Sequence, residues 1–484
     1  MSMSSPRPAL FPCLAPRTLV LGLFVFVAAY GPDEPVGPGN IDESGPELDA
    51  RLGTLLAAHR LDGRIEEQLE VKLGRPVNDG LAEVGRLLFF DRVLSLTEDN
   101  SCAGCHGPNV SFNDAVSISI GIDNNLVVGE ERQGPHNLRR APSVVNAAFF
   151  PRLMWDARFE SLSLDPFDNG DGFVFPEPEG TTLSRMDHLL AGQAFTPVVS
   201  RVEMAGFDFV GDADDIRAEV AARVDAIPEY RQRFGEIYPA INAGDPIDYD
   251  RIAEALAEFQ FTLVRADAPI DWYARGDTSA LTPSQKRGGI LFFGLEAGCF
   301  ECHITEGYAN QMFSDFKAHN LAVPQIRPVT TNVDFDGPGD NAAFGFEQAA
   351  REPADSYKIR TQPPGNVAFQ PSFMHNGAYV CLEDAVRHHT DVYTSLDNYT
   401  NTILSPSLRG PMGPVQPMLD LVHELSAEPR ELTDGDVEDL VAFMHALSDP
   451  DAHPDRLASI IPADVPSGLA LQDFDFTRSQ PSCS

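Results

Sequence analysis

Apolar residues along this chain recur mainly at the spacing of an α-helix. One helical face near the C-terminus consists of Val437, Leu440, Val441, Met444 and Leu447. Thr433 precedes this stretch and can cap its first turn. Helices are also predicted over 214–226 and 249–265, and the first of these should end before Pro228. The pattern therefore predicts a mostly α-helical fold.

Two segments of the chain repeat the same apolar pattern. Gly85–Phe90 and Gly289–Phe293 each have the composition of an apolar helix, and each leads into a loop that carries two cysteines. The second helix should begin at Pro283, because Thr282 and Gln285 can form a capping box around it. The repeat indicates two related helical modules.

The division between the modules is predicted within the polar stretch 267–279. We therefore expect an N-terminal domain over 51–270, a C-terminal domain over 271–450 and a tail over 451–484. Segments crowded with Gly, Pro and Asp, such as 165–180, are expected to be loops.

The N-terminus has the pattern of a secretory signal over residues 1–29. Arg7 and Arg17 precede an apolar run, 19–29, and Val27 and Ala29 fit the small-residue cleavage pattern. This run is short for a membrane span, and an uncleaved membrane anchor is the alternative to a cleaved signal. Residues 30–50 are expected to form a linker. The sequence thus predicts export to the periplasm or beyond.

The charge of the chain is strongly unbalanced. Its 484 residues include 35 basic and 72 acidic side chains, which gives a formal net charge of −37. Nucleic acid is excluded as a partner on this ground, because phosphate binding needs a basic face. We interpret the acidity as a soluble, self-repelling surface, and a partner with a basic patch is the alternative.

Two copies of a C-x-x-C-H motif carry the candidate chemistry. They are Cys102-Ala-Gly-Cys105-His106 and Cys299-Phe-Glu-Cys302-His303. This motif is the attachment site of a c-type haem, so we predict two covalently bound haems whose irons are ligated by the two motif histidines. A zinc site with two C-x-x-C knuckles is the alternative, but it leaves the adjacent histidines unexplained.

Three further cysteines remain. Cys13 lies in the predicted signal, and Cys381 and Cys483 can either pair in an oxidising compartment or stay as free thiols.

The residues around the motifs resemble those of the bacterial dihaem cytochrome c peroxidase and MauG superfamily, from about Leu81 to Leu447. The most specific matches are 140–146, Trp155-Asp-Ala-Arg158, Phe373-Met-His-Asn-Gly377 and 382–386. The resemblance implies that the N-terminal haem is peroxidatic and that the C-terminal haem transfers electrons. Function then depends on the sixth ligand of each iron.

For the peroxidatic haem, the resemblance makes His106 the proximal ligand and Glu203 the acid–base group. Gated relatives carry a distal His in a Ser-Ile-Gly-His segment, where this chain has Ile122. We therefore expect an open, five-coordinate iron of the MauG type. His136 is a candidate substitute ligand, although a structural role is favoured for it, and Gln133 or a water could assist Glu203.

For the electron-transfer haem, the resemblance makes His303 the proximal ligand and places His389 at the sixth-ligand position, where relatives have Met or Tyr. Bis-His ligation should lower the reduction potential. His388 and Met374 are the alternatives. Trp155 matches the inter-haem tryptophan of the family, and a buried core aromatic is its other interpretation.

The resemblance also implies a calcium ion between the domains, bound partly by an Asn side chain. Arg140 occupies that position, and a guanidinium cannot ligate Ca²⁺, so the family site is not expected, although this acidic chain could bind calcium elsewhere.

The sequence thus predicts an exported dihaem peroxidase that reduces hydrogen peroxide with electrons from a small cytochrome or copper protein. A MauG-like oxidase of residues on a partner protein is the first alternative, and a dihaem electron carrier without enzyme activity is the second. A homodimer stays open.

Overall fold

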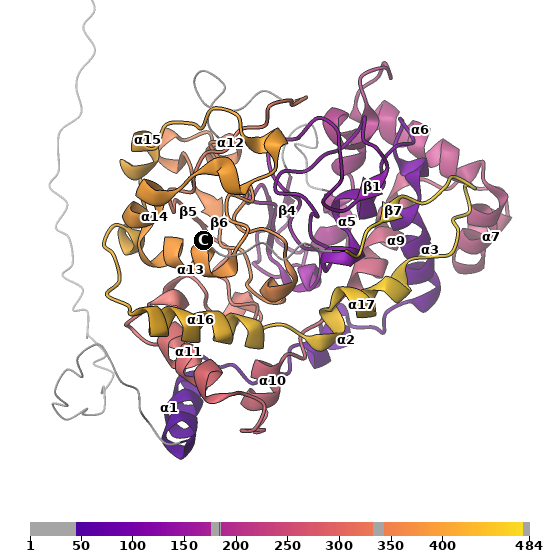
Figure 1. Ribbon diagram of the computed structural model, residues 1–484. Coiled ribbons are helices and arrows are strands. Elements are labelled where there is room, and N and C mark those ends of the chain that lie inside the picture. The colour runs from indigo at the N-terminus through magenta and orange to yellow at the C-terminus, as the bar shows by residue number, and fades with distance from the viewer. Residues whose placement is uncertain (1–44, 176–182, 184, 333–342, 478–484) are drawn as a thin grey trace, which may run out of the picture. The chain divides into compact units, whose positions relative to one another are not determined.

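Two pairs of crossing helices organise the fold (Figure 1). In this computed structural model, which describes residues 45–175, 183, 185–332 and 343–477, α3 (Asp79–Phe90) packs on α9 (Tyr249–Phe261). In the same way, α11 (Pro283–Phe293) packs on α16 (Asp434–Ala446). The helix pairs thus belong to the two predicted modules.

A glycine permits the close approach of the helices at each crossing. A Cβ on Gly85 would lie 1.8 Å from the Ala255 carbonyl oxygen, and one on Gly288 would lie 1.9 Å from the Asp439 carbonyl oxygen. Any larger residue would force the helices apart. Gly85 and Gly288, rather than Gly289, each lie four residues before a Phe-Phe pair, so they mark equivalent helix crossings.

The remaining α-helices range from one turn to the 14 residues of α1, and the strands are two or three residues long. The helices are α1 (Gly45–Ala58), α2 (Leu69–Leu73), α4 (Cys102–Cys105), α5 (Leu189–Gln193), α6 (Ala213–Asp225), α7 (Pro228–Ile237), α8 (Pro239–Asn242), α10 (Pro269–Ala274), α12 (Glu347–Ala350), α13 (Leu382–Thr390), α14 (Val392–Asn398), α15 (Gln416–Leu419) and α17 (Pro454–Leu457). The strands are β1 (Val127–Val128), β2 (Arg152–Leu153), β3 (Phe159–Ser161), β4 (Phe173–Val174), β5 (Ala318–His319), β6 (Ile359–Arg360) and β7 (Asp473–Phe474). They form a parallel β1–β7 pair and antiparallel β2–β3–β4 and β5–β6 sheets. The prediction of a mostly α-helical fold is confirmed.

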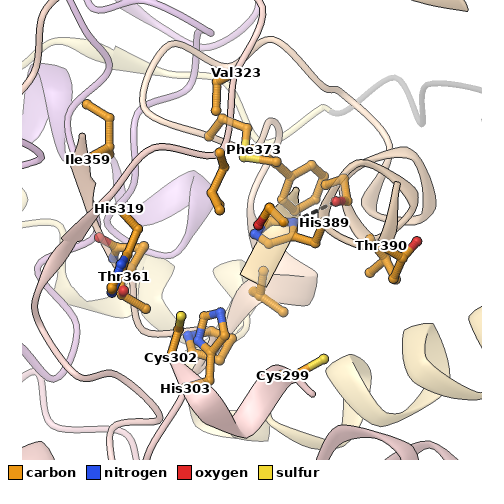
Figure 2. A pocket seen from close by; sticks show the side chains of 18 of the residues that line it. Cys299, Cys302, His303, His319, Val323, Ile359, Thr361, Phe373, His389 and Thr390 are labelled. Carbon is orange, nitrogen blue, oxygen red and sulfur yellow. Dashed lines mark hydrogen bonds between the residues drawn. The ribbon is translucent and has the colours of Figure 1, made fainter. Parts of the chain in front are cut away.

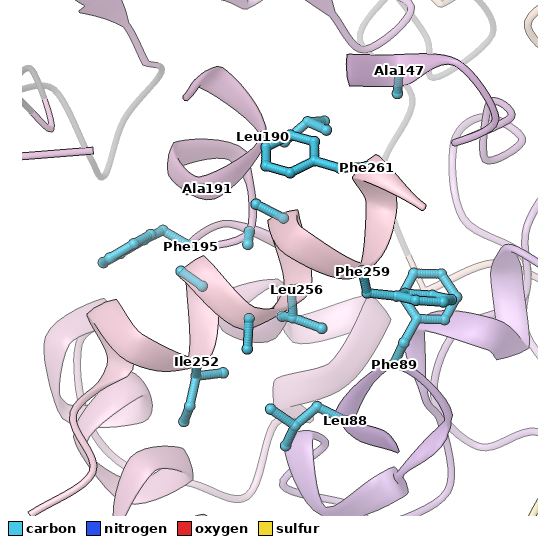
Figure 3. Packing of buried hydrophobic residues seen from close by; sticks show 14 of the residues in the cluster. Leu88, Phe89, Ala147, Leu190, Ala191, Phe195, Ile252, Leu256, Phe259 and Phe261 are labelled. Atoms are coloured by element: carbon cyan, nitrogen blue, oxygen red, sulfur yellow. The ribbon is translucent and has the colours of Figure 1, made fainter. Parts of the chain in front are cut away.

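Two clusters of buried apolar residues form the core. The first surrounds the α3–α9 crossing, where Leu88 and Phe89 meet Leu256 and Phe259 (Figure 3). The second surrounds the α11–α16 crossing and includes Phe292. Each cluster lies directly behind one C-x-x-C-H loop, so each core supports one candidate haem site.

The two ends of the described chain cross between these clusters. Leu48, Leu52 and Leu56 of α1 belong to the second cluster, and α1 packs on α11. After α16, the chain runs back to the first cluster, to which Leu457 and Val465 belong. Figure 1 shows α1 beside α11, and α17 and β7 on the side of α3. Sequence order alone therefore does not assign a residue to a core, and the domain division at 270/271 stays a prediction.

The structure differs from the expected elements at four places. The expected loop 165–180 contains the two-residue strand β4. A helix begins at Gly45, so residues 45–50 of the predicted linker are helical. This helix forms because Leu48, Leu52 and Leu56 recur every four residues and are buried in the core. The polar stretch 267–279 contains α10, whose Ile270 and Tyr273 are buried. Helix α9 ends at Phe261 rather than near 265, and the Asn146 side chain accepts a hydrogen bond from the Arg265 amide.

Two further predictions concern residues outside the described part of the chain. The signal, 1–29, lies there, and among the described helices none is long and apolar enough to cross a bilayer. Cys381 is disulfide-bonded, and the other described cysteines are free. Cys483 lies outside the described residues, so its pairing with Cys381 stays a prediction.

Candidate functional site

The first C-x-x-C-H motif lines an interior cavity of ≈ 350 Å³. Cys102 and Cys105 begin and end the single turn of α4, which places both sulfurs and the following His106 on the cavity wall. Burial raises the pKa of both thiols to about 12 and lowers the pKa of His106, so the imidazole is neutral and can ligate a metal.

Glu203 faces the same cavity from a π-helical turn, Arg201–Ala205. Such turns occur frequently at functional sites. Burial raises the pKa of the Glu203 carboxyl, and the positive charge of Arg158 opposes that rise. A carboxyl group with a raised pKa is suited to gain and release a proton. The structure thus places Glu203 in the cavity that also contains His106.

Residue 122 contributes no ligand to this cavity. Ile122 is buried, and its backbone amide donates to the Val202 carbonyl at 3.1 Å, beside the Glu203 turn. His136 lies outside the cavity, because its Nδ1 bonds to the Ile118 carbonyl at 2.8 Å and its Nε2 to the Ser407 hydroxyl at 3.0 Å. Gln133 is exposed and also lies outside it. In the described chain, the only histidine on this cavity wall is His106.

The second motif lines a separate cavity of ≈ 230 Å³ (Figure 2). His303 and His389 enter it from opposite sides, with ring centroids 6.5 Å apart. Metal–nitrogen bonds of about 2 Å on each side would place the centroids roughly 6 Å apart. The spacing therefore fits one iron between the two rings.

The other nitrogen of each ring is held by a backbone carbonyl. His303 Nδ1 lies 2.8 Å from the Phe313 oxygen, and His389 Nδ1 lies 2.7 Å from the Ala385 oxygen. Such bonds fix the tautomer that leaves Nε2 free for a metal. Burial lowers the pKa of both rings, to about 4 for His303, so both are neutral.

The alternative sixth ligands are placed differently. His388 is buried away from the cavity, with Nε2 at 2.8 Å from the Leu321 carbonyl and Nδ1 at 2.9 Å from the Tyr379 hydroxyl. Both of its nitrogens are therefore engaged. Met374 lines the cavity, but His389 is the residue that faces His303 ring to ring.

Trp155 and Arg360 line both cavities. The indole of Trp155 is buried, donates from Nε1 to the Arg140 carbonyl at 2.9 Å, and meets the His375 ring edge-on at 6.5 Å. This position supports either interpretation of Trp155, as a bridge or as a core aromatic. Arg360 was not predicted, because a lone arginine in sequence carries no signal of burial.

Arg360 tests whether the cavities suit haem. It is 2% exposed, burial lowers its pKa to about 9, and among the described residues it forms no ion pair. Its hydrogen bonds go to neutral acceptors such as the Met154 carbonyl at 2.8 Å. A buried cation between two largely apolar cavities suits a ligand that brings its own carboxylates, as haem does with its propionates. The residues present therefore fit haem.

The zinc alternative does not fit. Within the described ranges, the cysteine pairs line different cavities, so no four-cysteine site forms. The one group of metal-ligand type found among these residues is Cys302, Asp315 and His319. In that group His319 Nε2 lies 2.8 Å from the Asp315 carboxylate, which is an ion pair in its own right.

Arg140 is buried at the position where the family resemblance implies a calcium ligand. Its guanidinium donates to the backbone carbonyls of Asp114, at 3.3 Å, and Ser372. The side chain thus occupies carbonyl oxygens from both halves of the chain, which supports the prediction that calcium does not bind there.

A mostly helical chain with two cavities, each lined by a C-x-x-C-H motif, defines the class of two-haem redox proteins. Residues 79–279 match the family described as di-haem cytochrome c peroxidase. The MauG protein of Paracoccus denitrificans is 30% identical over 384 residues, which cover 78% of this chain and 90% of that protein. The chain therefore belongs to the di-haem cytochrome c peroxidase and MauG family, as the sequence predicted.

Further relatives and solved structures are similar to this chain over most of its length. Cytochrome c551 peroxidase of Pseudomonas aeruginosa is 27% identical, over 79% of this chain and 83% of that protein. Two crystal structures share the fold: a MauG-like protein associated with microbial copper homeostasis (TM-score 0.56, 24% identity, 78% of this chain and 92% of that one) and the diheme peroxidase BthA from Burkholderia thailandensis (TM-score 0.54, 23% identity, 82% and 91%). The chain is an oxidoreductase of this family.

Proposed function

We propose that this protein reduces hydrogen peroxide to water at the first cavity and receives the electrons through the second. The observation that carries the proposal is the inequality of the two cavities. Among the residues that the structure describes, His106 is the only histidine lining its cavity, whereas the ring centroid of His303 lies 6.5 Å from that of His389. An iron with an open position can bind peroxide, and an iron with two protein ligands transfers electrons.

In this proposal, each half of the chain is a cytochrome c-like module. Cys102 and Cys105 hold one haem by thioether bonds, and Cys299 and Cys302 hold the other. The crossing helix pair behind each motif supports the assignment. We assign no calcium ion to the family position, because Arg140 donates to the carbonyls there, and calcium elsewhere on this acidic chain stays an open prediction.

The protein residues contribute a proton path and an electron path. When bound, the haem supplies an iron centre that accepts peroxide and exchanges electrons. Glu203 is placed to take a proton from one peroxide oxygen and return it to the leaving oxygen. Burial raises the pKa of its carboxyl above the ordinary value for glutamate, which favours its use as a proton carrier. Trp155, which lines both cavities, is the proposed intermediary for electrons.

A MauG-like oxidation of residues on a partner protein is the second candidate. Ile122 at the gating position and a sixth ligand other than Met favour it, and so does the 30% identity to MauG of Paracoccus denitrificans. A non-enzymatic electron carrier is less well supported, because it requires a protein ligand on each side of both irons.

The proposed cellular location and electron donor are inferred from the sequence. The predicted signal over 1–29 supports export, and a small cytochrome or copper protein is the proposed electron donor. With a net charge of −37, a donor with a basic patch would be attracted. A homodimer stays a prediction without structural support.

Peroxide added to the purified ferric dihaem protein tests the proposal. We expect a rapid shift of the Soret band and oxidation of a reduced donor cytochrome. Glu203→Gln should slow the peroxide step by about 10²–10⁴-fold, whereas Glu131→Gln, at an exposed glutamate, should not. No spectral change in the wild type would contradict the proposal. Turnover of a partner protein without oxidation of any donor would favour the MauG-like candidate.

A further inference from the structure

The C-terminal strap, residues 461–477, lies against the first C-x-x-C-H loop. It returns from α16 and pairs β7 in parallel with β1, with Asp473 opposite Val127 and Phe474 opposite Val128. Gln472 directly precedes this strand and is only 3% exposed. A long polar side chain this deeply buried needs hydrogen-bond partners.

The Gln472 amide bonds to two residues that directly precede the first motif. Its Oε1 accepts from the Ser101 hydroxyl at 2.7 Å, and its Nε2 donates to Asn100 Oδ1 at 3.4 Å. Ser101 and Asn100 are each 1% exposed. Ser101 is also the N-cap residue, directly before the first residue of α4. The strap is therefore bonded to the start of the turn that carries both cysteines.

Asn100 extends this connection to Glu203. Its Nδ2 donates to the Glu203 backbone carbonyl at 3.0 Å. The amide can face only this way, because its Oδ1 accepts from Arg132 Nη2 at 2.9 Å and a guanidinium has no acceptor. The direction of each bond from Gln472 to Glu203 is thus fixed.

Gly104, within the first motif, leaves room for the Asn100 and Gln472 amides. A Cβ on Gly104 would lie 2.1 Å from Asn100 Oδ1 and 2.7 Å from Gln472 Oε1. The second motif has Glu301 at the corresponding position, and its carboxylate pairs with Arg430 at 3.3 Å. The close packing of two side-chain amides against the motif is therefore a feature of the first motif, and the second motif has an ion pair instead.

We propose that Gln472 is a positioning residue that holds the Glu203 turn in place through Asn100. The C-terminal strap thereby completes the first cavity, although its residues come from the far end of the chain. The expected effect of Gln472 on the peroxide reaction rests on the function proposed above for Glu203. The hydrogen-bonded path itself is independent of that reaction.

The test compares Gln472→Met with Asp473→Asn in the full-length dihaem protein. Methionine fills the same space on Gly104 without the two hydrogen bonds, and Asp473 is the exposed neighbour on the same strap. Two properties are measured: the rate of the Soret change with peroxide, and the affinity of the ferric protein for cyanide. Cyanide binding needs a base to accept the proton of HCN but requires no turnover.

We expect Gln472→Met to slow the peroxide step by between about tenfold and about a hundredfold. It should also weaken cyanide binding, and Asp473→Asn should change neither. If the wild type binds cyanide but does not react with peroxide, a weakened cyanide affinity still supports the positioning role while the proposed function fails.

Equal rates and equal affinities in the two variants would overturn the proposal, even if Gln472→Met unfolds at a lower temperature. A wild type that does not bind cyanide would also overturn it. Should Gln472→Met fail to incorporate haem, Asn100→Asp replaces it, because a carboxylate of the same shape cannot donate to the Glu203 carbonyl. The same losses are then expected.

Discussion

At the scale of single residues, two neighbouring histidines show how position decides chemistry. His388 and His389 are adjacent on α13, yet the first has both nitrogens bonded away from the cavity and the second faces His303. The family register selected His389 from the sequence. The engagement of His388 could not be predicted, because Leu321 and Tyr379 are brought to it by other segments.

Replacing His389 should change the electron-transfer haem. In His389→Met a thioether would replace an imidazole, so the reduction potential of the second haem should rise. A spectroelectrochemical titration measures it. His388→Gln is the matched control: it should leave the potential unchanged and lower the free energy of unfolding, since buried hydrogen bonds are lost. An unchanged potential in His389→Met would show that another residue ligates this iron.

At the scale of elements, capping and apolar spacing made the long helices predictable. The capping box expected at Thr282 is present, and Thr433 forms a further box with Asp436 that was not predicted. Helix α10 was missed because its polar residues suggested a boundary, and tertiary packing outweighed that signal. The π-helical turn that carries Glu203 has no sequence signature of its own, so only the family resemblance pointed to that residue.

The two helix crossings should be sensitive to a single methyl group. Gly85→Ala and Gly288→Ala each place a Cβ within 2 Å of a backbone oxygen, and should lower the free energy of unfolding by about 1–3 kcal/mol. Gly53→Ala, in α1 with open space around it, should raise it by about 0.5–1 kcal/mol. Urea unfolding measures all three. Equal effects at the three positions would contradict the crossing geometry.

Helix α10 should make stability depend on pH. Burial raises the pKa of Asp271 to about 7, so its contribution is fully present below the unfolded pKa, near 4, and is lost as pH rises through 7. Asp271→Asn mimics the protonated form. The variant should equal the wild type in free energy of unfolding at pH 4 and exceed it at pH 8. A difference that does not change with pH would contradict the assignment.

At the scale of the whole molecule, the two ends of the described part of the chain link the two halves. Helix α1 joins the second core, and the C-terminal strap joins the first cavity. The sequence predicted the haem motifs, the individual long helices and the family, because these depend on local pattern. Contacts such as Gln472 with Ser101, or Arg360 between the cavities, join residues far apart in sequence and leave no local signal.

Trp155 should affect communication between the two halves. Trp155→Phe keeps an aromatic ring at the contact of the cavities but removes the easily oxidised indole. The peroxide step at the first haem should keep its rate, and the subsequent oxidation of the reduced second haem should slow several-fold. Stopped-flow spectroscopy separates the two steps. Trp272→Phe, at the other tryptophan, is the control, and equal behaviour of the two variants would leave Trp155 as a core aromatic.

The central claim is that two identical attachment motifs hold two unequal irons. Electron paramagnetic resonance of the resting ferric protein tests it most directly. We expect one high-spin signal, from the haem on His106, and one low-spin signal of equal intensity, from the haem between His303 and His389. Two low-spin signals would contradict it, because both irons would then have six ligands and neither would be open to peroxide.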